Sequence, residues 1–199
     1  MNLILDLGNV VLDWDPAGFI HRLPFETATR RAIAREIFDH SDWLAMDGGL
    51  KTETELIERI TLTTDLAESQ LRAALLAARH ALVEIPETIV LMRELKQRGV
   101  PMYCLSNMSV ENYEFIRRRE FFSLFDGIVI SGIEKAVKPG QKIFELLVDR
   151  FDLEVGQTLF VDDMPENINA AEQFGIRGIL FDRSADSYRR IRQSLLKNP

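Results

Sequence analysis

The sequence has few cysteines, histidines and tryptophans. Among its 199 residues are one cysteine, three histidines and two tryptophans. A single cysteine excludes a disulfide framework and a thiolate zinc site within one chain. Cys104 lies in the apolar run VPMYCL, which predicts a buried core position. His21, His40 and His80 are scattered at no metal-ligand spacing, so we interpret them as surface or helix-packing residues.

The sequence also lacks long apolar runs and an excess of positive charge. No uninterrupted apolar run approaches the length that crosses a membrane, and no basic region precedes the first apolar stretch. The net charge of -7 argues against a nucleic-acid partner and against an anionic membrane surface. We therefore expect a cytoplasmic protein that binds neither nucleic acid nor membrane. Whether it is a monomer or a homodimer stays open.

Five short apolar runs are present, and they alternate with helical patterns. Valine, isoleucine, leucine and phenylalanine dominate these runs with little polar alternation, as in strands that are buried on both faces of a parallel sheet. The runs are LILDL near residue 3, PMYCLS from 101, GIVIS from 127, TLFVDD from 158 and GILF from 178. The alternation predicts an α/β fold with a doubly wound, mostly parallel sheet.

A long interval separates the first predicted strand from the second. Residues 7–99 are far more than a crossover helix needs, and most of the interval has a helical pattern. Thr52 followed by Glu55 is a capping-box signature for one of its helices. The interval therefore predicts a helical-bundle cap inserted after the first strand. The predicted ranges are 1–13 and 86–199 for the α/β core and 14–85 for the cap.

Polar clusters follow the predicted strands at the places where those strands end. In chain order they are Asp6, Ser106 with Asn107, Lys138 in the loop after the third strand, and Asp162 with Asp163. The carboxyl ends of parallel strands share one edge of the sheet, where open α/β folds bind ligands. Each cluster taken alone is more simply explained by turn chemistry or a helix cap. Their joint placement favours a functional site.

The four clusters together resemble the haloacid dehalogenase-like (HAD) hydrolase superfamily. ILDLGNVV resembles its first motif, CLSN its second, VKPGQKIF its third and FVDDMPENI its fourth. The resemblance spans the chain, and the helical insert corresponds to the cap over that superfamily's Rossmann-like core. Within the superfamily, the opening is most similar to a branch of small bacterial phosphatases with a DLGNV motif, which includes α-D-glucose-1-phosphate phosphatase.

The resemblance implies a Mg²⁺-dependent phosphatase site. Asp6 would attack phosphorus and form an aspartyl-phosphate that water then hydrolyses. Asp6, the carbonyl oxygen of Gly8 and Asp163 would hold Mg²⁺. Asp162 would act through a water molecule or hold Lys138. The residues implied to bind the phosphoryl group are Ser106, Asn107 and Lys138.

Gly8 departs from the commoner D-x-D form of the first motif, in which a second carboxylate protonates the leaving alcohol. Such general acid–base help is typically worth ~10²–10⁴-fold in rate. Its absence implies a substrate with a good leaving group, an acid supplied from elsewhere, or a protein that barely turns over. Asp13, Asp15 and the cap residue Asp47 are candidate substitutes, and each is also explained as a cap or turn residue.

We therefore predict a Mg²⁺-dependent phosphomonoesterase that acts on a small phosphorylated metabolite, with a sugar phosphate such as glucose 1-phosphate as a candidate. One alternative is a 2-haloacid dehalogenase, whose branch lacks the second carboxylate but needs no metal. Another is a non-catalytic protein that binds a phosphate ligand. The cap should select the substrate, and Trp43, Leu44 and Met46 are candidates either for a pocket or for the core of the bundle.

Overall fold

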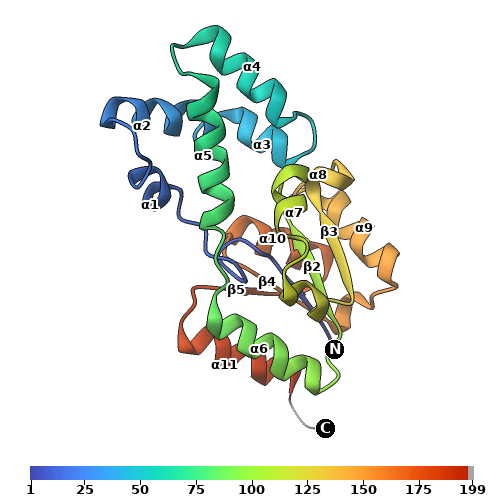
Figure 1. Ribbon diagram of the computed structural model, residues 1–199. Coiled ribbons are helices and arrows are strands. Elements are labelled where there is room, and N and C mark those ends of the chain that lie inside the picture. The colour runs from blue at the N-terminus through green and yellow to red at the C-terminus, as the bar shows by residue number, and fades with distance from the viewer. Residues whose placement is uncertain (197–199) are drawn as a thin grey trace.

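The computed structural model describes residues 1–196, with a parallel sheet at one end and a group of helices at the other (Figure 1). The sheet has five strands in the order β3-β2-β1-β4-β5. They are β1 (Asn2–Leu5), β2 (Met102–Ser106), β3 (Gly127–Ile130), β4 (Thr158–Asp162) and β5 (Arg177–Leu180). Every strand overlaps the apolar run that predicted it, and every pair is parallel. The predicted α/β class and doubly wound sheet are confirmed.

The central strand β1 is the point at which the strand order reverses. The chain continues from β1 to β2 and β3 on one side, and then places β4 and β5 on the other side. Open α/β sheets bind ligands in the crevice at such a switch point. Asp6 follows β1 directly, and its amide donates to the carbonyl of Val161 in β4 (3.0 Å). The fold therefore places Asp6 at the mouth of this crevice.

Helices cover both faces of the sheet, and the period-2 alternation of strand side chains assigns the faces. Leu3 and Leu5 pack in one apolar cluster with residues of α6 and α11, whereas Ile4 packs in a second cluster with residues of α9 and α10. The four helices are α6 (Pro86–Gln97), α9 (Gln141–Phe151), α10 (Pro165–Phe174) and α11 (Ala185–Leu195). Strands buried on both faces explain the continuous apolar runs of the sequence.

Short helical segments complete the core, and the sequence patterns do not predict them. They are α7 (Val110–Ile116), η2 (Glu120–Leu124), α8 (Ser131–Glu134) and η3 (Val155–Gln157). Segments of one or two turns are too short to show a helical period in the sequence. The hydroxyl group of Ser109 caps α7 by accepting a hydrogen bond from the amide of Asn112 (3.3 Å).

The helices between β1 and α6 have an apolar core of their own. They are α1 (Pro16–His21), α2 (Thr27–Ile33), the π-helical turn η1 (Ala34–Phe38), α3 (Ser41–Asp47), α4 (Glu53–Thr63) and α5 (Glu68–Ala81). Ile33, Leu56 and Leu71 belong to a cluster that is separate from the two clusters of the sheet. The predicted capping box at Thr52 and Glu55 is present at the start of α4. That the cap begins at residue 14 and ends at residue 85 stays a prediction.

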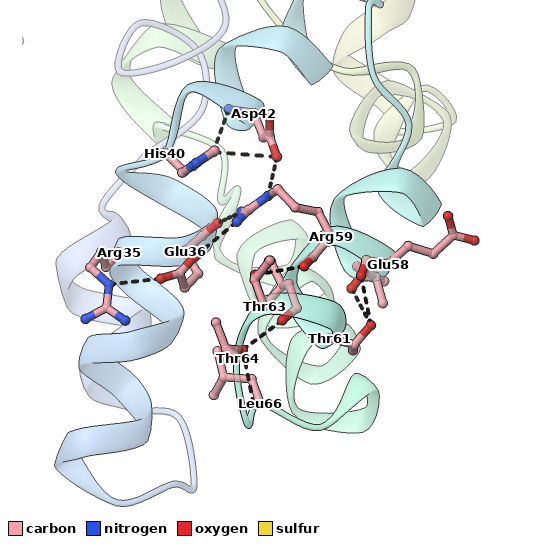
Figure 2. Close-up of polar contacts among 12 residues, drawn as sticks. Arg35, Glu36, His40, Asp42, Glu58, Arg59, Thr61, Thr63, Thr64 and Leu66 are labelled. Carbon is pink, nitrogen blue, oxygen red and sulfur yellow. Dashed lines mark hydrogen bonds and ion pairs between the residues drawn. The ribbon is translucent and has the colours of Figure 1, made fainter.

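Ion pairs tie the start of α3 to α4 (Figure 2). The carboxylate of Asp42 accepts from Arg59 Nε (2.6 Å) and lies 2.6 Å from Lys51 Nζ. Arg59 Nη1 also lies 3.1 Å from a carboxylate oxygen of Glu36, and His40 Nδ1 accepts from the amide of Asp42 (3.1 Å). Because Asp42 and Arg59 are largely buried, this network fixes α3, the helix that carries Trp43 and Asp47.

No helix within the described part of the chain is long and apolar enough to cross a membrane.

Candidate active site

Three carboxylates and one ammonium group meet at the carboxyl edge of the sheet. Asp6 follows β1, Asp162 ends β4, Asp163 follows it, and Lys138 comes from the loop before α9. The Nζ atom of Lys138 lies 2.8 Å from Asp6 Oδ1 and 2.6 Å from Asp162 Oδ2. These four residues, called the carboxylate–lysine cluster below, are the ones that sequence reasoning placed at one edge. Lys138, Asp6 and Asp162 are buried.

Asp162 has the most constrained carboxylate of the cluster. Besides the bond from Lys138, its Oδ1 atom accepts from the amide of Met164 (2.8 Å) and from Asn167 Nδ2 (3.0 Å). Its side chain is fully buried. With these donors in place, Asp162 is suited to hold Lys138 and the start of α10.

Asn107 holds the backbone of Lys138. Its side-chain oxygen accepts from the Lys138 amide (2.9 Å), and its Nδ2 donates to the Lys138 carbonyl (2.9 Å). The side chain of Asn107 therefore positions the lysine. Asn107 would bind a ligand through its backbone amide. Ser106 is buried beside Asp6, where its hydroxyl group lowers the pKa of that carboxyl.

The charges of the cluster change the pKa values of its members. Burial raises the pKa of Asp6 to about 6, although Lys138 opposes the change; the nearby charge of Asp162 adds to it. Burial alone would lower the pKa of Lys138, but Asp6 and Asp162 together hold it above its ordinary value. Burial also raises the pKa of Asp163, against a hydrogen bond from Asn9. Lys138 therefore stays charged and leaves the cluster with an excess of negative charge.

This excess of negative charge fits a divalent cation. Carboxylate oxygens of Asp6, Asp162 and Asp163 lie within 4.8 Å of one another. Asp6 Oδ1 is buried and accepts no aligned hydrogen bond from the described residues, although Lys138 Nζ is close to it. The carbonyl oxygen of Gly8 is not an acceptor of the backbone hydrogen bonds in its turn. Hard oxygen atoms of this kind are the ligands that Mg²⁺ takes.

Asn9 supports the site, although the sequence motifs did not single it out. Its φ of 54° lies in the left-handed region, which asparagine tolerates better than most residues. Its Nδ2 donates to Asp163 Oδ2 (3.0 Å), and its Oδ1 accepts from the amide of Trp14 (3.2 Å) and from Arg183 Nη2 (2.7 Å). Asn9 thus joins the turn after β1 to the turn after β4. The Gly8-Asn9 dipeptide, which is typical of a turn, was the feature of the sequence that could have identified Asn9.

The three candidate substitutes for the missing carboxylate lie in different places. Asp13 pairs with Arg183 (2.7 Å), and Asp15 caps α1 by accepting from the amide of Gly18 (2.9 Å). Only Asp47, among these three, lines the same cavity as Asp6. Its carbonyl accepts a hydrogen bond from the hydroxyl group of Ser131, which joins the end of α3 to α8. Burial raises the pKa of Asp47 to about 7.

A cavity of about 200 Å³ lies between the edge of the sheet and the cap helices. Asp6, Gly8, Ser106 and Asp163 line one part of it. The apolar side chains that line it are Trp14, Trp43, Leu82, Met108 and Met164. Of the cap residues that the sequence proposed for a pocket or a core, Trp43 lines this cavity, Met46 is buried in the cap cluster and Leu44 is 71% exposed.

The chain is similar to known hydrolases over most of its length. A model of the haloacid dehalogenase-like hydrolase family matches residues 9–175. A sesquiterpene phosphatase of Aspergillus oryzae, astK, is 26% identical over 191 residues, which cover 96% of this chain and 94% of that protein.

Solved structures show the same fold. A HAD-like family hydrolase from Porphyromonas gingivalis aligns with a TM-score of 0.78 at 24% identity, over 100% of this chain and 98% of that one. A HAD family enzyme from Bacteroides thetaiotaomicron, solved with magnesium and inorganic phosphate, aligns with a TM-score of 0.73 at 23% identity, over 93% of this chain and 96% of that one.

Proposed function

Because the chain belongs to the haloacid dehalogenase-like hydrolase family, we propose that it hydrolyses phosphomonoesters with Mg²⁺ through an aspartyl-phosphate on Asp6. The family and the hydrolase class that the four motifs predicted are confirmed. The observation that carries the proposal is the carboxylate–lysine cluster, which combines a buried nucleophile with oxygen ligands for a cation and a compensating ammonium group. The DLGNV phosphatase branch stays a prediction.

The residues of the site divide the work of two displacements. The Asp6 carboxylate attacks phosphorus, the bond from phosphorus to the alcohol oxygen breaks, and the leaving oxygen takes a proton from Asp47 or from solvent. Water then attacks the aspartyl-phosphate, which releases inorganic phosphate and restores Asp6. Ser106 and the backbone amides after β2 are placed to bind the phosphoryl oxygens. Lys138 keeps Asp6 ionised by opposing the effect of its burial.

Asp6, the Gly8 carbonyl and Asp163 are the proposed Mg²⁺ ligands. Mg²⁺ would supply positive charge against the phosphoryl oxygens as charge develops on them. The Bacteroides enzyme solved with magnesium and inorganic phosphate supports this assignment by analogy. The dehalogenase alternative needs no cation, so it does not explain why a third carboxylate, Asp163, lies within 4.8 Å of Asp6 and Asp162. A small phosphorylated metabolite is the proposed substrate class.

The alcohol part of the substrate has two candidates. The DLGNV motif favours a sugar phosphate such as glucose 1-phosphate. The relative named as a sesquiterpene phosphatase favours a phosphate ester of an apolar alcohol. Both share the phosphate chemistry of the carboxylate–lysine cluster, so they differ only in what the rest of the cavity has to accommodate.

Release of inorganic phosphate from p-nitrophenyl phosphate tests the proposed reaction. Wild-type protein should be active with Mg²⁺ and inactive after EDTA treatment, and Asp6→Asn should abolish turnover because the neutral amide is a very weak nucleophile. Asp65→Asn, at an exposed carboxylate, is the matched control and should keep wild-type activity. Acid-quenched protein should carry labelled phosphate on Asp6. Full activity of Asp6→Asn, or activity that EDTA leaves unchanged, would contradict the mechanism.

A further inference from the structure

The cavity has a polar part and an apolar part. Its polar part is the sheet edge, which the proposed function assigns to phosphate and metal. The rest of the lining includes Trp14 and Trp43 and the apolar side chains of Leu82, Met108 and Met164, of which the two methionines directly follow Asn107 and Asp163. The two tryptophans, called the tryptophan wall below, are the only tryptophans in the chain. The alcohol part of a phosphate ester held at Asp6 must lie against this apolar lining.

Few polar groups are available in the apolar part of the cavity. Among its lining residues outside the sheet edge, the polar side chains are Asp47 and Asn112, and each tryptophan adds one indole N–H donor. The side-chain oxygen of Asn112 already accepts from Arg79 Nε (3.2 Å). A buried hydroxyl group without a partner costs about 1–3 kcal/mol, and a hexose would bring several of them. The lining therefore disfavours a sugar and favours an alcohol with little or no polar surface beyond its ester oxygen.

The tryptophan wall is held in place before any ligand binds. The rings of Trp14 and Trp43 stack with centroids 5.7 Å apart and an interplanar angle of 11°. Phe38 lies 4.9 Å from Trp43, and Phe19 lies 5.6 Å from Trp14. The Asp42–Arg59 pair fixes the first turn of α3 beside Trp43 (Figure 2). Rigid aromatic surface binds flat apolar groups at a low cost in conformational entropy.

We propose that the phosphate ester cleaved here has a flat, apolar alcohol part, an aryl or a short allylic prenyl group, that packs against the tryptophan wall. This inference rests on the proposed phosphomonoesterase function and identifies its substrate class. For the aryl group it also fits Gly8, because an aryl alcohol leaves more readily than an alkyl alcohol when no carboxylate stands at that position to protonate it.

Substrate competition tests the proposal. We expect kcat/KM for dimethylallyl phosphate and phenyl phosphate to exceed that for glucose 1-phosphate by at least ~10-fold, the discrimination that a complementary apolar pocket provides. Acetyl phosphate has no prenyl, aryl or sugar group, so its hydrolysis measures phosphoryl transfer to Asp6 without any contribution from the alcohol part. No release of phosphate from acetyl phosphate would contradict the proposed function. Release from acetyl phosphate together with equal or faster turnover of glucose 1-phosphate would overturn only the inference about the tryptophan wall.

Variants of Trp43 give a second measurement. Trp43→Ala should lower kcat/KM for dimethylallyl phosphate by ~10–100-fold relative to its effect on acetyl phosphate, as at a binding hot spot, and Trp43→Phe should retain most of the preference. Phe115→Ala, at a partly exposed aromatic residue outside the cavity, is the matched control and should keep the wild-type ratio. Equal losses on both substrates in Trp43→Ala, which would leave the wild-type ratio unchanged, would overturn the proposal.

Tryptophan fluorescence, excited at wavelengths that tyrosine does not absorb, reports on the tryptophan wall directly, since both tryptophans of the chain belong to it. Titration of the Asp6→Asn protein with dimethylallyl phosphate should give a saturable change in tryptophan emission. Inorganic phosphate and glucose 1-phosphate should give a much smaller change. An identical response to all three ligands, or no response to dimethylallyl phosphate, would contradict the proposal without any measurement of turnover.

Discussion

The carboxylate–lysine cluster and the tryptophan wall face the same cavity and are stabilised in different ways. In the cluster, charged atoms lie 2.6–2.8 Å apart, and each contact compensates for the removal of a charge from water. In the wall, the two rings lie 5.7 Å apart, with Phe38 4.9 Å from Trp43, and they gain free energy from buried area and ring geometry. The cluster needs particular atoms at particular positions, whereas the wall needs a surface of the right shape.

This difference separates catalysis from selection. Substitutions in the cluster should reduce the turnover of every phosphate substrate, because all of them share the phosphoryl group. Substitutions in the wall should change the ranking of substrates, because only the alcohol part differs among them. This assignment of catalysis to the cluster and selection to the wall would be wrong if a cluster variant changed the ranking of substrates. It would also be wrong if a wall variant reduced the turnover of all substrates equally.

Among substitutions that leave the nucleophile Asp6 in place, Lys138→Met should have the largest effect. The variant leaves Asp6 and Asp162 buried without their ammonium partner, and breaking a buried ion pair costs about 3–5 kcal/mol of unfolding free energy. Turnover should fall by ~10²–10³-fold, as when one positioned donor is removed from a reaction centre. Urea unfolding and initial rates measure the two effects. Lys142→Met, at an exposed lysine, should change neither.

The stability loss in Lys138→Met should depend on pH. The pKa of Asp6 is already raised to about 6 in the folded protein, so stability falls as pH rises through that value. Lys138 opposes the rise, and its loss pushes the pKa of Asp6 higher. The destabilisation relative to wild type should therefore be larger at pH 8 than at pH 5, where Asp6 is protonated. A pH-independent loss would mean that Lys138 acts through packing alone.

Asp163→Asn should have an intermediate effect that Mg²⁺ reverses. A neutral amide replaces an anionic oxygen ligand, so the Mg²⁺ concentration for half-maximal activity should rise by at least ~10-fold, the scale of losses around metal ligands. Saturating Mg²⁺ should recover part of the activity. Asp149→Asn, at an exposed helix position, is the control. An unchanged Mg²⁺ requirement would remove Asp163 from the ligand set.

Asp47→Asn should have the most selective effect, because it should depend on the substrate. Burial raises the pKa of Asp47 to about 7, so its carboxyl group holds a proton below that pH and loses it above. If this proton goes to the leaving alcohol, turnover of alkyl phosphates should fall as pH rises through about 7. Asp47→Asn should then lower their turnover by ~10²-fold and remove this pH dependence.

Gly8→Asp sharpens the same test. A Cβ atom at Gly8 would meet only Asp6 Oδ2, at an ordinary 3.7 Å, so the turn accommodates a side chain there. The new carboxylate should restore alkyl phosphate turnover in the Asp47→Asn background. Single-turnover rates are the measurement, because slow hydrolysis of the aspartyl-phosphate would hide the difference. Unchanged rates in Asp47→Asn would mean that Asp47 does not protonate the leaving alcohol. The single-turnover rate of the wild-type protein should then depend steeply on the acidity of the leaving group.

Much of the core could be predicted from the sequence because its signals are local. Strands buried on both faces must be apolar throughout, so five apolar runs predicted five strands. Strand ends in a parallel sheet share an edge, so Asp6, Lys138 and Asp162 could be placed together before their distances were known. The short helices α1, α3, α7 and α8 have no sequence period long enough to identify them.

The sequence by itself therefore determined the fold class, the family and the kind of atoms at the reaction centre, because strand patterns and motif chemistry depend on residues close together in the chain. The tertiary structure decided which partners the side chains take. It engaged Asn107 with the Lys138 backbone, brought Asp47 rather than Asp13 or Asp15 into the cavity, and stacked Trp14 on Trp43. The first outcome depends on how two loops of the core meet, and the other two depend on how the cap helices pack against one another and on the sheet edge; no local pattern specifies that packing.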